Sequence, residues 1–532
     1  MDAGWELLQQ RGMWAWQRGL LFMAEESWSQ WRAEARRTGS RLQEARSLNA
    51  LGCVEFALGR LEQAEAMWLS ASRLIESDPG ATPVDWVQVM TNRALVAFRR
   101  GRLADAKQYV FAAQRCCDQV HPELVARVQQ SASSILVALG SWEEAEATAR
   151  QALRLFEETG DRVRAAHLLS NLGSVEIERG NFETARQYLE NARDVLQSAG
   201  RETDLGCTYT ELGRLWFVAG DVNKAAACGS EALRLLWSNV LSVHKMEAAR
   251  LSELFGAIAL AVGDRHSALI DLQRASAYFA QASMWREWSR VNRQLDALLE
   301  QRSGPQEVFV SGAGIHPECN ERLRYLATLL DLLDSIESLY PELRFRAELA
   351  AWYALLLGEA YGLDQEEREA LAHAAKLQDV GLASLEPEIM DGSRPLSRAA
   401  QDRVRAHPTF GEQIVSLFPV PAACRDAIRH HHERYDGRGY PDGLAGEDIP
   451  HLARIIAVAS TYVHDAVEWG HRHAMENLVR QRGRALDPVL VDHFIALHEG
   501  ACNPRATGAS GPSPLPGAGG LGAQGVRTFG RA

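Results

Sequence analysis

Glycine recurs along the first half of the chain at intervals of 39 to 43 residues, and each of these glycines is followed five residues later by an alanine. The glycines are Gly19, Gly59, Gly101, Gly140, Gly180, Gly220 and Gly263, and the alanines are Ala24, Ala64, Ala106, Ala145, Ala185, Ala225 and Ala268. Glycine tolerates the conformation that ends a helix, and alanine lets two helix backbones approach closely. The repeat therefore predicts a series of helical hairpins rather than a generic alanine-rich bundle.

Six of the seven repeats carry a second alanine seven residues after the first, and the exception is Trp31. This pattern resembles the tetratricopeptide repeat in a form longer than the usual period of about 34 residues. Such repeats stack into a solenoid with a concave groove. We expect residues 1–300 to form seven such repeats, and the groove to bind a protein or peptide partner. Five tryptophans crowd the first repeat and indicate either an aromatic binding surface or packing at the solenoid end: Trp5, Trp14, Trp16, Trp28 and Trp31.

The repeat pattern stops near Gly304-Pro305, so a linker is predicted over residues 301–318. Helical patterning resumes from Leu323, and we place a second domain at residues 319–500. Residues 501–532 are rich in glycine, proline and other small residues and have few apolar side chains. Such a segment buries too little apolar surface to offset the cost of ordering it, and a disordered tail is predicted.

Three adjacent histidines, His430 to His432, lead into a glycine-rich acidic turn in the second domain. Neutral imidazole is the commonest metal ligand, although adjacent histidines alone are a weak signal. The longer stretch from His431-His432-Glu433 through Asp436-Gly437-Arg438-Gly439-Tyr440-Pro441 is more specific. It closely resembles the HD-GYP family of bacterial metal-dependent phosphodiesterases, whose usual substrate is the cyclic dinucleotide cyclic-di-GMP.

That resemblance implies an all-α domain of the HD superfamily that binds divalent metal, commonly iron or manganese. By local motif, four residues match the family's ligands: Asp379, which would also be catalytic, His407, His431 and His432. The resemblance assigns ligand binding, and contacts with diguanylate cyclase domains, to the loop containing Arg438, Gly439, Tyr440 and Pro441. A purely structural role for this loop is the alternative.

Other family positions are replaced in this chain. By this resemblance, Gln378 replaces the histidine of the His-Asp pair, and Leu382 replaces a lysine. Ser460 replaces an aspartate on a later helix, and Arg346 is aligned with a histidine on an early helix. Glutamine and serine are poor ligands, and arginine is no ligand. His464, one turn beyond Ser460, is either a substitute ligand or a surface residue.

Two functions therefore remain open from the sequence. The family favours an active cyclic-di-GMP phosphodiesterase with a reduced metal site. The replacements favour a catalytically impaired module that binds a nucleotide or a partner protein and is coupled to the repeats.

The composition limits the other classes of function. A formal net charge of −12 argues against binding to a nucleic-acid polymer or an anionic membrane. The eight cysteines include no Cys-x-x-Cys pair, which favours free thiols in a reducing compartment. No basic-then-apolar opening or long apolar run is present. We expect a cytoplasmic protein with no membrane segment.

Overall fold

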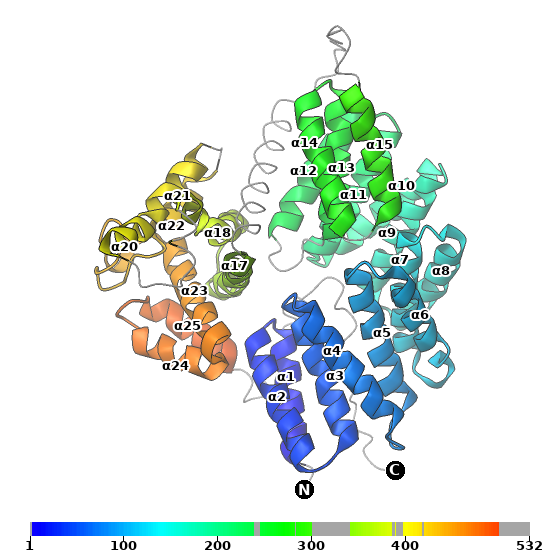
Figure 1. The fold of residues 1–532 in the computed structure, drawn as a ribbon, viewed down its shortest axis with the longest axis horizontal. Coiled ribbons are helices and arrows are strands. Elements are labelled where there is room, and N and C mark those ends of the chain that lie inside the picture. Colours follow the sequence, from blue (N-terminus) through cyan, green and yellow to red (C-terminus); the bar gives the residue numbers. More distant parts are fainter. Residues whose placement is uncertain are drawn as a thin grey trace. The chain divides into compact units, whose positions relative to one another are not determined.

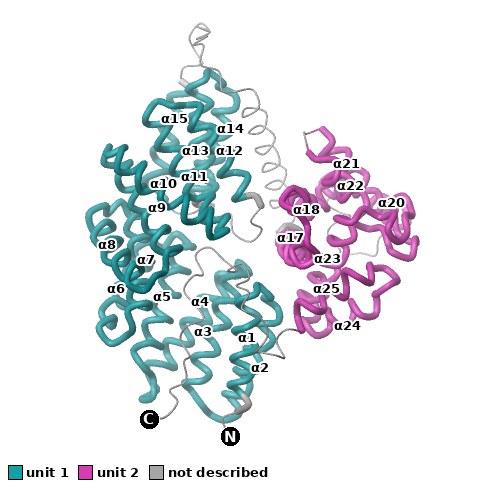
Figure 2. The backbone as a smooth tube through the Cα atoms, turned by 180° about the vertical axis from the view of Figure 1, so that it is seen from behind, with its two compact units in different colours: residues 1–236, 242–320, 510–532 teal, residues 237–241, 321–509 magenta. Residues whose placement is uncertain are grey.

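The structure is a computed structural model and describes residues 3–238, 245–281, 284–300, 341–385, 389, 397–417 and 420–499. Its secondary structure within these ranges is helical, with no β-strand, which confirms the predicted all-α class. The chain divides into two compact units, residues 1–236 with 242–320 and 510–532, and residues 237–241 with 321–509 (Figure 2). Each unit is described by itself.

The first unit is an array of helical hairpins (Figure 1). Its elements are α1 (Ala3–Gln17), α2 (Leu21–Arg37), α3 (Arg41–Ala57), α4 (Leu61–Glu76), α5 (Pro83–Arg99), α6 (Leu103–Gln114), η1 (Cys117–Gln119), α7 (Pro122–Ala138), α8 (Trp142–Thr159), α9 (Arg162–Glu178), α10 (Phe182–Ser198), α11 (Glu202–Val218), α12 (Val222–Ser238), α13 (Lys245–Ala261), α14 (Arg265–Gln281) and α15 (Trp285–Glu300). Successive helices pack as pairs, for example α3 on α4 and α9 on α10.

The hairpin prediction is confirmed in detail. All seven recurrent glycines have positive φ values, between 71° and 86°, and lie in the turns between paired helices. Each alanine that follows at the fifth position is fully buried. Glycine is also required inside some helices, because a Cβ atom at Gly173 would lie 2.6 Å from Leu189 Cγ on the paired helix. Close contact between helix backbones thus explains the small residues of the repeat.

The tryptophans of the first hairpin mainly serve packing. Trp16, Trp28 and Trp31 are buried, and the ring centroids of Trp16 and Trp28 lie 6.0 Å apart. These three rings build the core of the first hairpin and leave no exposed aromatic face of their own. The packing interpretation is therefore confirmed for them.

The second unit is also helical. Its described elements are α17 (Pro341–Tyr361), α18 (Gln365–Leu377), η3 (Val380–Ser384), α20 (Arg398–Arg405), α21 (His407–Ser416), α22 (Ala422–His430), η4 (Gly446–Asp448), α23 (His451–Trp469), α24 (His471–Gln481) and α25 (Pro488–Glu499). Helix α17 packs against α18, α23 and α25. Tyr353, Tyr462 and Phe494 are fully buried where these helices meet.

Some predictions lie outside the described residues, namely the linker at 301–318, the start of the second domain from 319 and the tail at 501–532. Among the helices that are described, none combines the length and apolar character needed to cross a membrane.

Candidate metal centre

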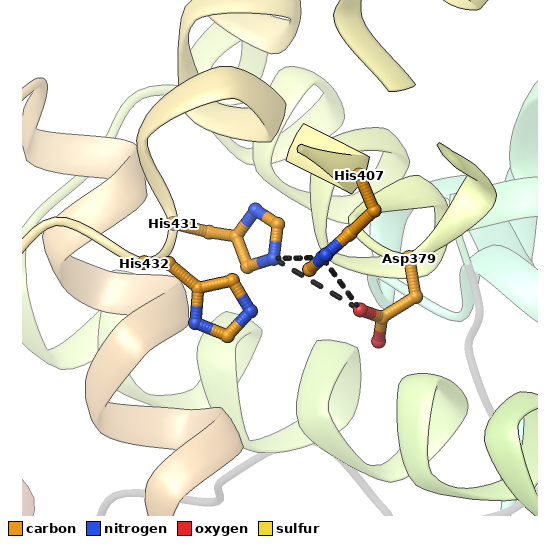
Figure 3. A group of neighbouring side chains, drawn as sticks. All are labelled: Asp379, His407, His431 and His432. Carbon is orange, nitrogen blue, oxygen red and sulfur yellow. Dashed lines mark hydrogen bonds and ion pairs between the residues drawn. The ribbon is translucent and has the colours of Figure 1, made fainter. Parts of the chain in front are cut away.

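Four side chains of the second unit point toward one another (Figure 3). Asp379, His407, His431 and His432 each offer one ligand atom, and these four atoms all lie within 4.8 Å of one another. Asp379 lies between α18 and η3, His407 is the first residue of α21, and the two histidines directly follow α22. The structure therefore brings together all four residues that the motifs single out as ligands.

Glycine at position 381 permits this convergence. A Cβ atom there would lie 2.0 Å from the carbonyl oxygen of His407 and 2.7 Å from the backbone nitrogen of Gly411. Only a residue without a side chain lets η3 approach the first turn of α21 so closely. That approach sets Asp379, two residues earlier, beside His407.

Backbone hydrogen bonds orient two of the imidazoles. His407 Nδ1 lies 2.6 Å from the carbonyl oxygen of Val404, and His431 Nδ1 lies 2.7 Å from that of Ile428. A carbonyl oxygen only accepts, so each Nδ1 donates its hydrogen. In a neutral ring the opposite nitrogen, Nε2, then carries a lone pair.

The two Nε2 atoms face each other at 3.3 Å, and Asp379 Oδ1 lies 3.3 Å from His407 Nε2 and 3.9 Å from His431 Nε2. Burial, and then the neighbouring His407, lower the pKa of His431 to about 3, so this ring is neutral near pH 7. With both rings neutral, two lone pairs and a carboxylate thus converge. Such a cluster fits a cation.

His432 completes the cluster from the side of the glycine-rich loop. Burial, followed by the two other histidines, lowers the pKa of His432 to about 2. Its ring stacks on Tyr440, with centroids 4.8 Å apart and planes 21° apart. The guanidinium of Arg405 lies 5.7 Å from the centroid of the tyrosine ring. Tyr440 therefore links the candidate ligand His432 to Arg405, a cation that sequence reasoning did not identify.

The loop itself is held by two acidic side chains. Glu433 Oε1 accepts hydrogen bonds from the backbone nitrogens of Asp442 and Gly443, at 2.7 and 2.9 Å. Asp442 in turn accepts from Arg429 and lies 3.0 Å from His430 Nε2. His430, although adjacent to the candidate ligands, therefore contacts the loop instead.

The other residues of the loop differ in their packing and exposure. A Cβ atom at Gly439 would lie 2.4 Å from the backbone nitrogen of Arg434, so the loop needs glycine there. Arg438 is exposed, and the bond between Tyr440 and Pro441 is cis. Ligand binding by these residues stays a prediction.

Two of the replaced positions, Gln378 and Ser460, contact each other. Ser460 on α23 donates a hydrogen bond of 3.0 Å to Gln378 Oε1, and Gln378 is buried beside Asp379 in the sequence. Leu382 is buried as well. An amide and a hydroxyl that satisfy each other offer a metal ion much less than a histidine and an aspartate would.

The other two candidate positions contact residues outside the cluster. Arg346 on α17 forms an ion pair with Glu468 on α23. Glu468 is eight residues beyond Ser460, about two helical turns along α23. Arg346 thus pairs with a carboxylate, as suits a residue that is no metal ligand. The side chain of His464 is 62% exposed and contacts its neighbour Asp465, which agrees with a surface residue.

Three imidazole nitrogens and one carboxylate oxygen form a donor set suited to a divalent transition metal such as iron, manganese or zinc. Two of the rings are already oriented for this by their backbone hydrogen bonds. The geometry therefore identifies a candidate centre for one metal ion.

Comparison with known proteins finds both an HD domain and tetratricopeptide repeats in this chain. A family model described as HD domain matches residues 332–490, and one described as tetratricopeptide repeat matches residues 124–198. The cyclic di-GMP phosphodiesterase response regulator RpfG of Xanthomonas campestris is 31% identical over 236 residues, which cover 41% of this chain and 60% of that protein.

A second relative is the 3'3'-cGAMP-specific phosphodiesterase 2 of Vibrio cholerae, 29% identical over 31% of this chain and 35% of that protein. The chain thus spans less than two thirds of the length of either relative. Among solved structures, NprR in complex with its cognate peptide NprX matches 62% of this chain and 99% of its own, with 13% identity and a TM-score of 0.43.

Proposed function

We propose that this chain, with its HD domain and tetratricopeptide repeats, is a signalling protein of the HD-GYP type. Its HD domain would bind a cyclic dinucleotide or a partner protein, with impaired hydrolysis. Asp379, His407, His431 and His432 would hold one divalent ion, iron or manganese. The observation that carries this proposal is the hydrogen bond between Ser460 and Gln378, at positions where the family has ligands.

A second metal ion would find only weak ligands at Gln378 and Ser460. A pair of metal ions activates water and holds the attacked phosphate from both sides, whereas a single ion supplies only part of that charge. Gln378 and Ser460 are neutral and satisfy each other, so neither competes well for a cation. Asp379 would then hold one ion rather than bridge two.

The substrate class follows from the relatives, which act on cyclic-di-GMP or 3'3'-cGAMP. We place the nucleotide next to the cluster, where Asp379 is partly exposed and Tyr440 and Arg405 offer an aromatic ring and a positive charge. The exposed part of the loop, which includes Arg438, is where we propose contacts with diguanylate cyclase domains.

The test uses the purified full chain, loaded anaerobically with Fe²⁺ or Mn²⁺, beside Asp379→Ala. We expect one ion per chain, binding of cyclic-di-GMP or 3'3'-cGAMP, and no linear dinucleotide or GMP. An intact enzyme of the same family, active in the same buffer, controls for the assay.

The alternative is an active phosphodiesterase, which the convergence of four ligand atoms favours. Linear product that appears with the unmutated chain and disappears with Asp379→Ala would establish it. Two tightly bound ions per chain would also contradict the impaired module. Absence of both nucleotide binding and turnover would leave protein partners as the ligands of the HD domain.

A further inference from the structure

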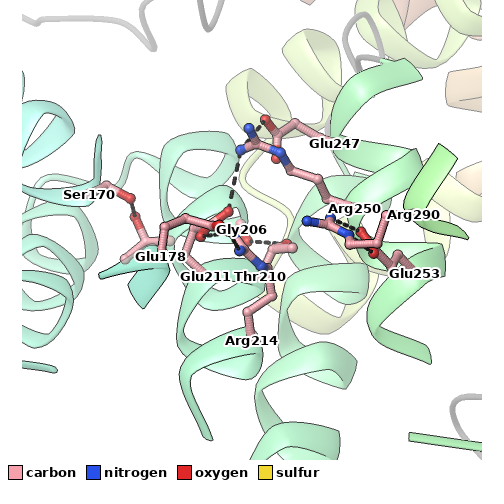
Figure 4. Close-up of polar contacts among 11 residues, drawn as sticks. Ser170, Glu178, Gly206, Thr210, Glu211, Arg214, Glu247, Arg250, Glu253 and Arg290 are labelled. Atoms are coloured by element: carbon pink, nitrogen blue, oxygen red, sulfur yellow. Dashed lines mark hydrogen bonds and ion pairs between the residues drawn. The ribbon is translucent and has the colours of Figure 1, made fainter. Parts of the chain in front are cut away.

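Polar contacts between neighbouring helices fix the direction of charged side chains in the first unit (Figure 4). Arg250 on α13 lies 3.3 Å from Glu211 on α11. Arg290 on α15 makes two hydrogen bonds of 2.8 Å to Glu253 on α13. The candidate metal ligands of the second unit are held by polar contacts too, with one exception.

His432 is the exception. No hydrogen bond or ion pair involves its ring nitrogens within the part of the chain that the structure describes, and the dashed lines of Figure 3 do not reach it. The rings of His407 and His431, in contrast, each donate from Nδ1 to a backbone carbonyl oxygen. A ligating imidazole needs a second contact that sets its orientation, and loss of that contact commonly lowers metal affinity about 10- to 100-fold. A contact other than a hydrogen bond must therefore direct the ring of His432.

The ring of Tyr440 supplies this contact. It stacks on the ring of His432 with centroids 4.8 Å apart and planes 21° apart. The rings of His407 and His431 meet the His432 ring at 84° and 43°, so the tyrosine ring is the closest to parallel. The backbone nitrogen of Tyr440 also donates a hydrogen bond of 3.3 Å to the carbonyl oxygen of His432. Tyr440 thus restrains both the backbone and the ring of this ligand.

The loop that carries Tyr440 is itself fixed to the segment after His432. Glu433 Oε1 accepts hydrogen bonds from the backbone nitrogens two and three residues beyond Tyr440. A Cβ atom at Gly439 would lie 2.5 Å from Cα of Glu433, so the chain just before Tyr440 lies directly on the chain just after His432. These contacts return the tyrosine to the histidine eight positions earlier in the sequence.

A cation also contacts the tyrosine ring. Arg405 is the last residue of α20, and its guanidinium lies 5.7 Å from the ring centroid. The residue before it, Val404, accepts the hydrogen bond from His407 Nδ1. A cation–π contact of an exposed arginine is weak, so Arg405 supports the position of Tyr440 rather than determining it. The segment that orients His407 therefore contacts Tyr440 as well.

We propose that Tyr440 is a positioning residue of the metal centre, whose ring holds the imidazole of His432 in the orientation that completes the cluster. The inference rests on the proposed binding of one ion by Asp379, His407, His431 and His432. It gives the glycine-rich loop a task at the metal centre itself, beyond contacts with a nucleotide or a partner protein.

The first test needs no metal ion. A stacked aromatic ring shifts the ¹H resonances of the imidazole beside it through its ring current. In the full chain with ¹³C-labelled histidine, His432→Gln identifies the resonance of His432. Tyr440→Leu should move this resonance, and Tyr440→Phe, which keeps the ring, should leave it in place. Tyr440→Met repeats the test with a second side chain that has no ring, in case Tyr440→Leu does not fold.

The second test measures the bound ion. The Mn²⁺ affinity of Tyr440→Leu should fall about 10- to 100-fold, and pulsed EPR of the bound Mn²⁺ should detect two coordinated imidazoles instead of three. Tyr440→Phe should keep the affinity and all three imidazoles. Tyr435→Leu is the matched control, because Tyr435 lies in the same loop and its ring contacts no candidate ligand among the described residues. It should keep both as well.

An unchanged His432 resonance in Tyr440→Leu would overturn the inference, and so would an unchanged Mn²⁺ affinity with three imidazoles. Equal losses in Tyr440→Leu and Tyr435→Leu would also overturn it, because a general loss of loop structure would then explain both. Loss of cyclic-di-GMP binding alone in Tyr440→Leu would make Tyr440 a nucleotide contact and not a positioning residue.

Failure of the proposed function would look different. Linear product or two bound ions with the unmutated chain would contradict the impaired module and leave the role of Tyr440 unaffected. If the unmutated chain bound no Mn²⁺, the proposed metal centre would fail, and the histidine resonance would still decide whether Tyr440 orients His432.

Discussion

The hydroxyl of Ser460 on α23 donates a hydrogen bond of 3.0 Å to Oε1 of Gln378 at the end of α18. The two residues are 82 positions apart in the sequence. Each satisfies the other in a partly buried environment where an unpaired amide or hydroxyl would be costly. The pair therefore stabilises the HD domain without a metal ion.

Restoring ligands at both positions should add metal. For Gln378→His with Ser460→Asp, we expect bound Mn²⁺ to rise from one to two ions per chain, because an imidazole and a carboxylate replace two weak donors. Elemental analysis after gel filtration measures the ratio. The control is Gln378→Leu with Ser460→Ala, which should stay at one ion. Two ions on the unmutated chain would contradict this prediction.

Local patterns predicted much of the fold but not this pair. The turn at Gly59 and the buried Ala64 could be predicted because a positive φ and a close helix contact each depend on one residue and its neighbours. The contact between Ser460 and Gln378 depends on how α18 and α23 pack, which no local motif encodes.

The same limit applies to other contacts near the site. The ion pair between Arg346 and Glu468 follows from the packing of α17 on α23. Arg405 lies over Tyr440, 35 positions later in the chain. By contrast, Asp379 and His407 each carry a recognisable local motif, and both lie in the cluster.

The adjacent histidines 430 and 431 should behave differently when each is replaced. His431→Ala removes a ligand nitrogen from the cluster and should weaken Mn²⁺ binding by at least about 100-fold. His430→Ala removes only a contact to Asp442 and should keep the full metal content. Isothermal titration of the two variants measures both effects. Equal losses would mean that the cluster is not the metal site.

Gly381→Ala should disrupt the centre through the backbone. Its Cβ atom would lie 2.0 Å from the carbonyl oxygen of His407, so η3 and α21 must separate. We expect a loss of about 2–3 kcal/mol in unfolding free energy, typical of overpacking, and weaker Mn²⁺ binding. Urea denaturation and metal titration measure the two effects.

Ala383→Ser is the control for that variant, since Ala383 is exposed in the same 3₁₀ helix. It should change neither stability nor metal affinity. Wild-type metal affinity in Gly381→Ala would show that the spacing between η3 and α21 does not position Asp379.

Acid should destabilise the metal-free HD domain, because buried histidines resist protonation. Burial lowers the pKa of His498 to about 4, and that of His431 to about 3, from a usual 6.5. The unfolded chain therefore binds protons more readily below pH 6.5, so this stabilisation is complete above pH 6.5 and is lost as the pH falls toward the folded values. Each histidine contributes about 1.4 kcal/mol per pH unit in that window.

Melting curves between pH 7.5 and 4.5 test this, with the HD-domain transition identified as the one that Mn²⁺ shifts. His498→Phe should reduce the dependence of that transition on pH, because the ring packs against Tyr353, Tyr462 and Phe494 without a hydrogen-bond partner for Nε2 among the described residues. Mn²⁺ should instead steepen it, since ligated imidazoles stay unprotonated in the folded state while the unfolded chain still takes up protons. An unchanged dependence in both cases would mean that groups other than these histidines control the acid sensitivity.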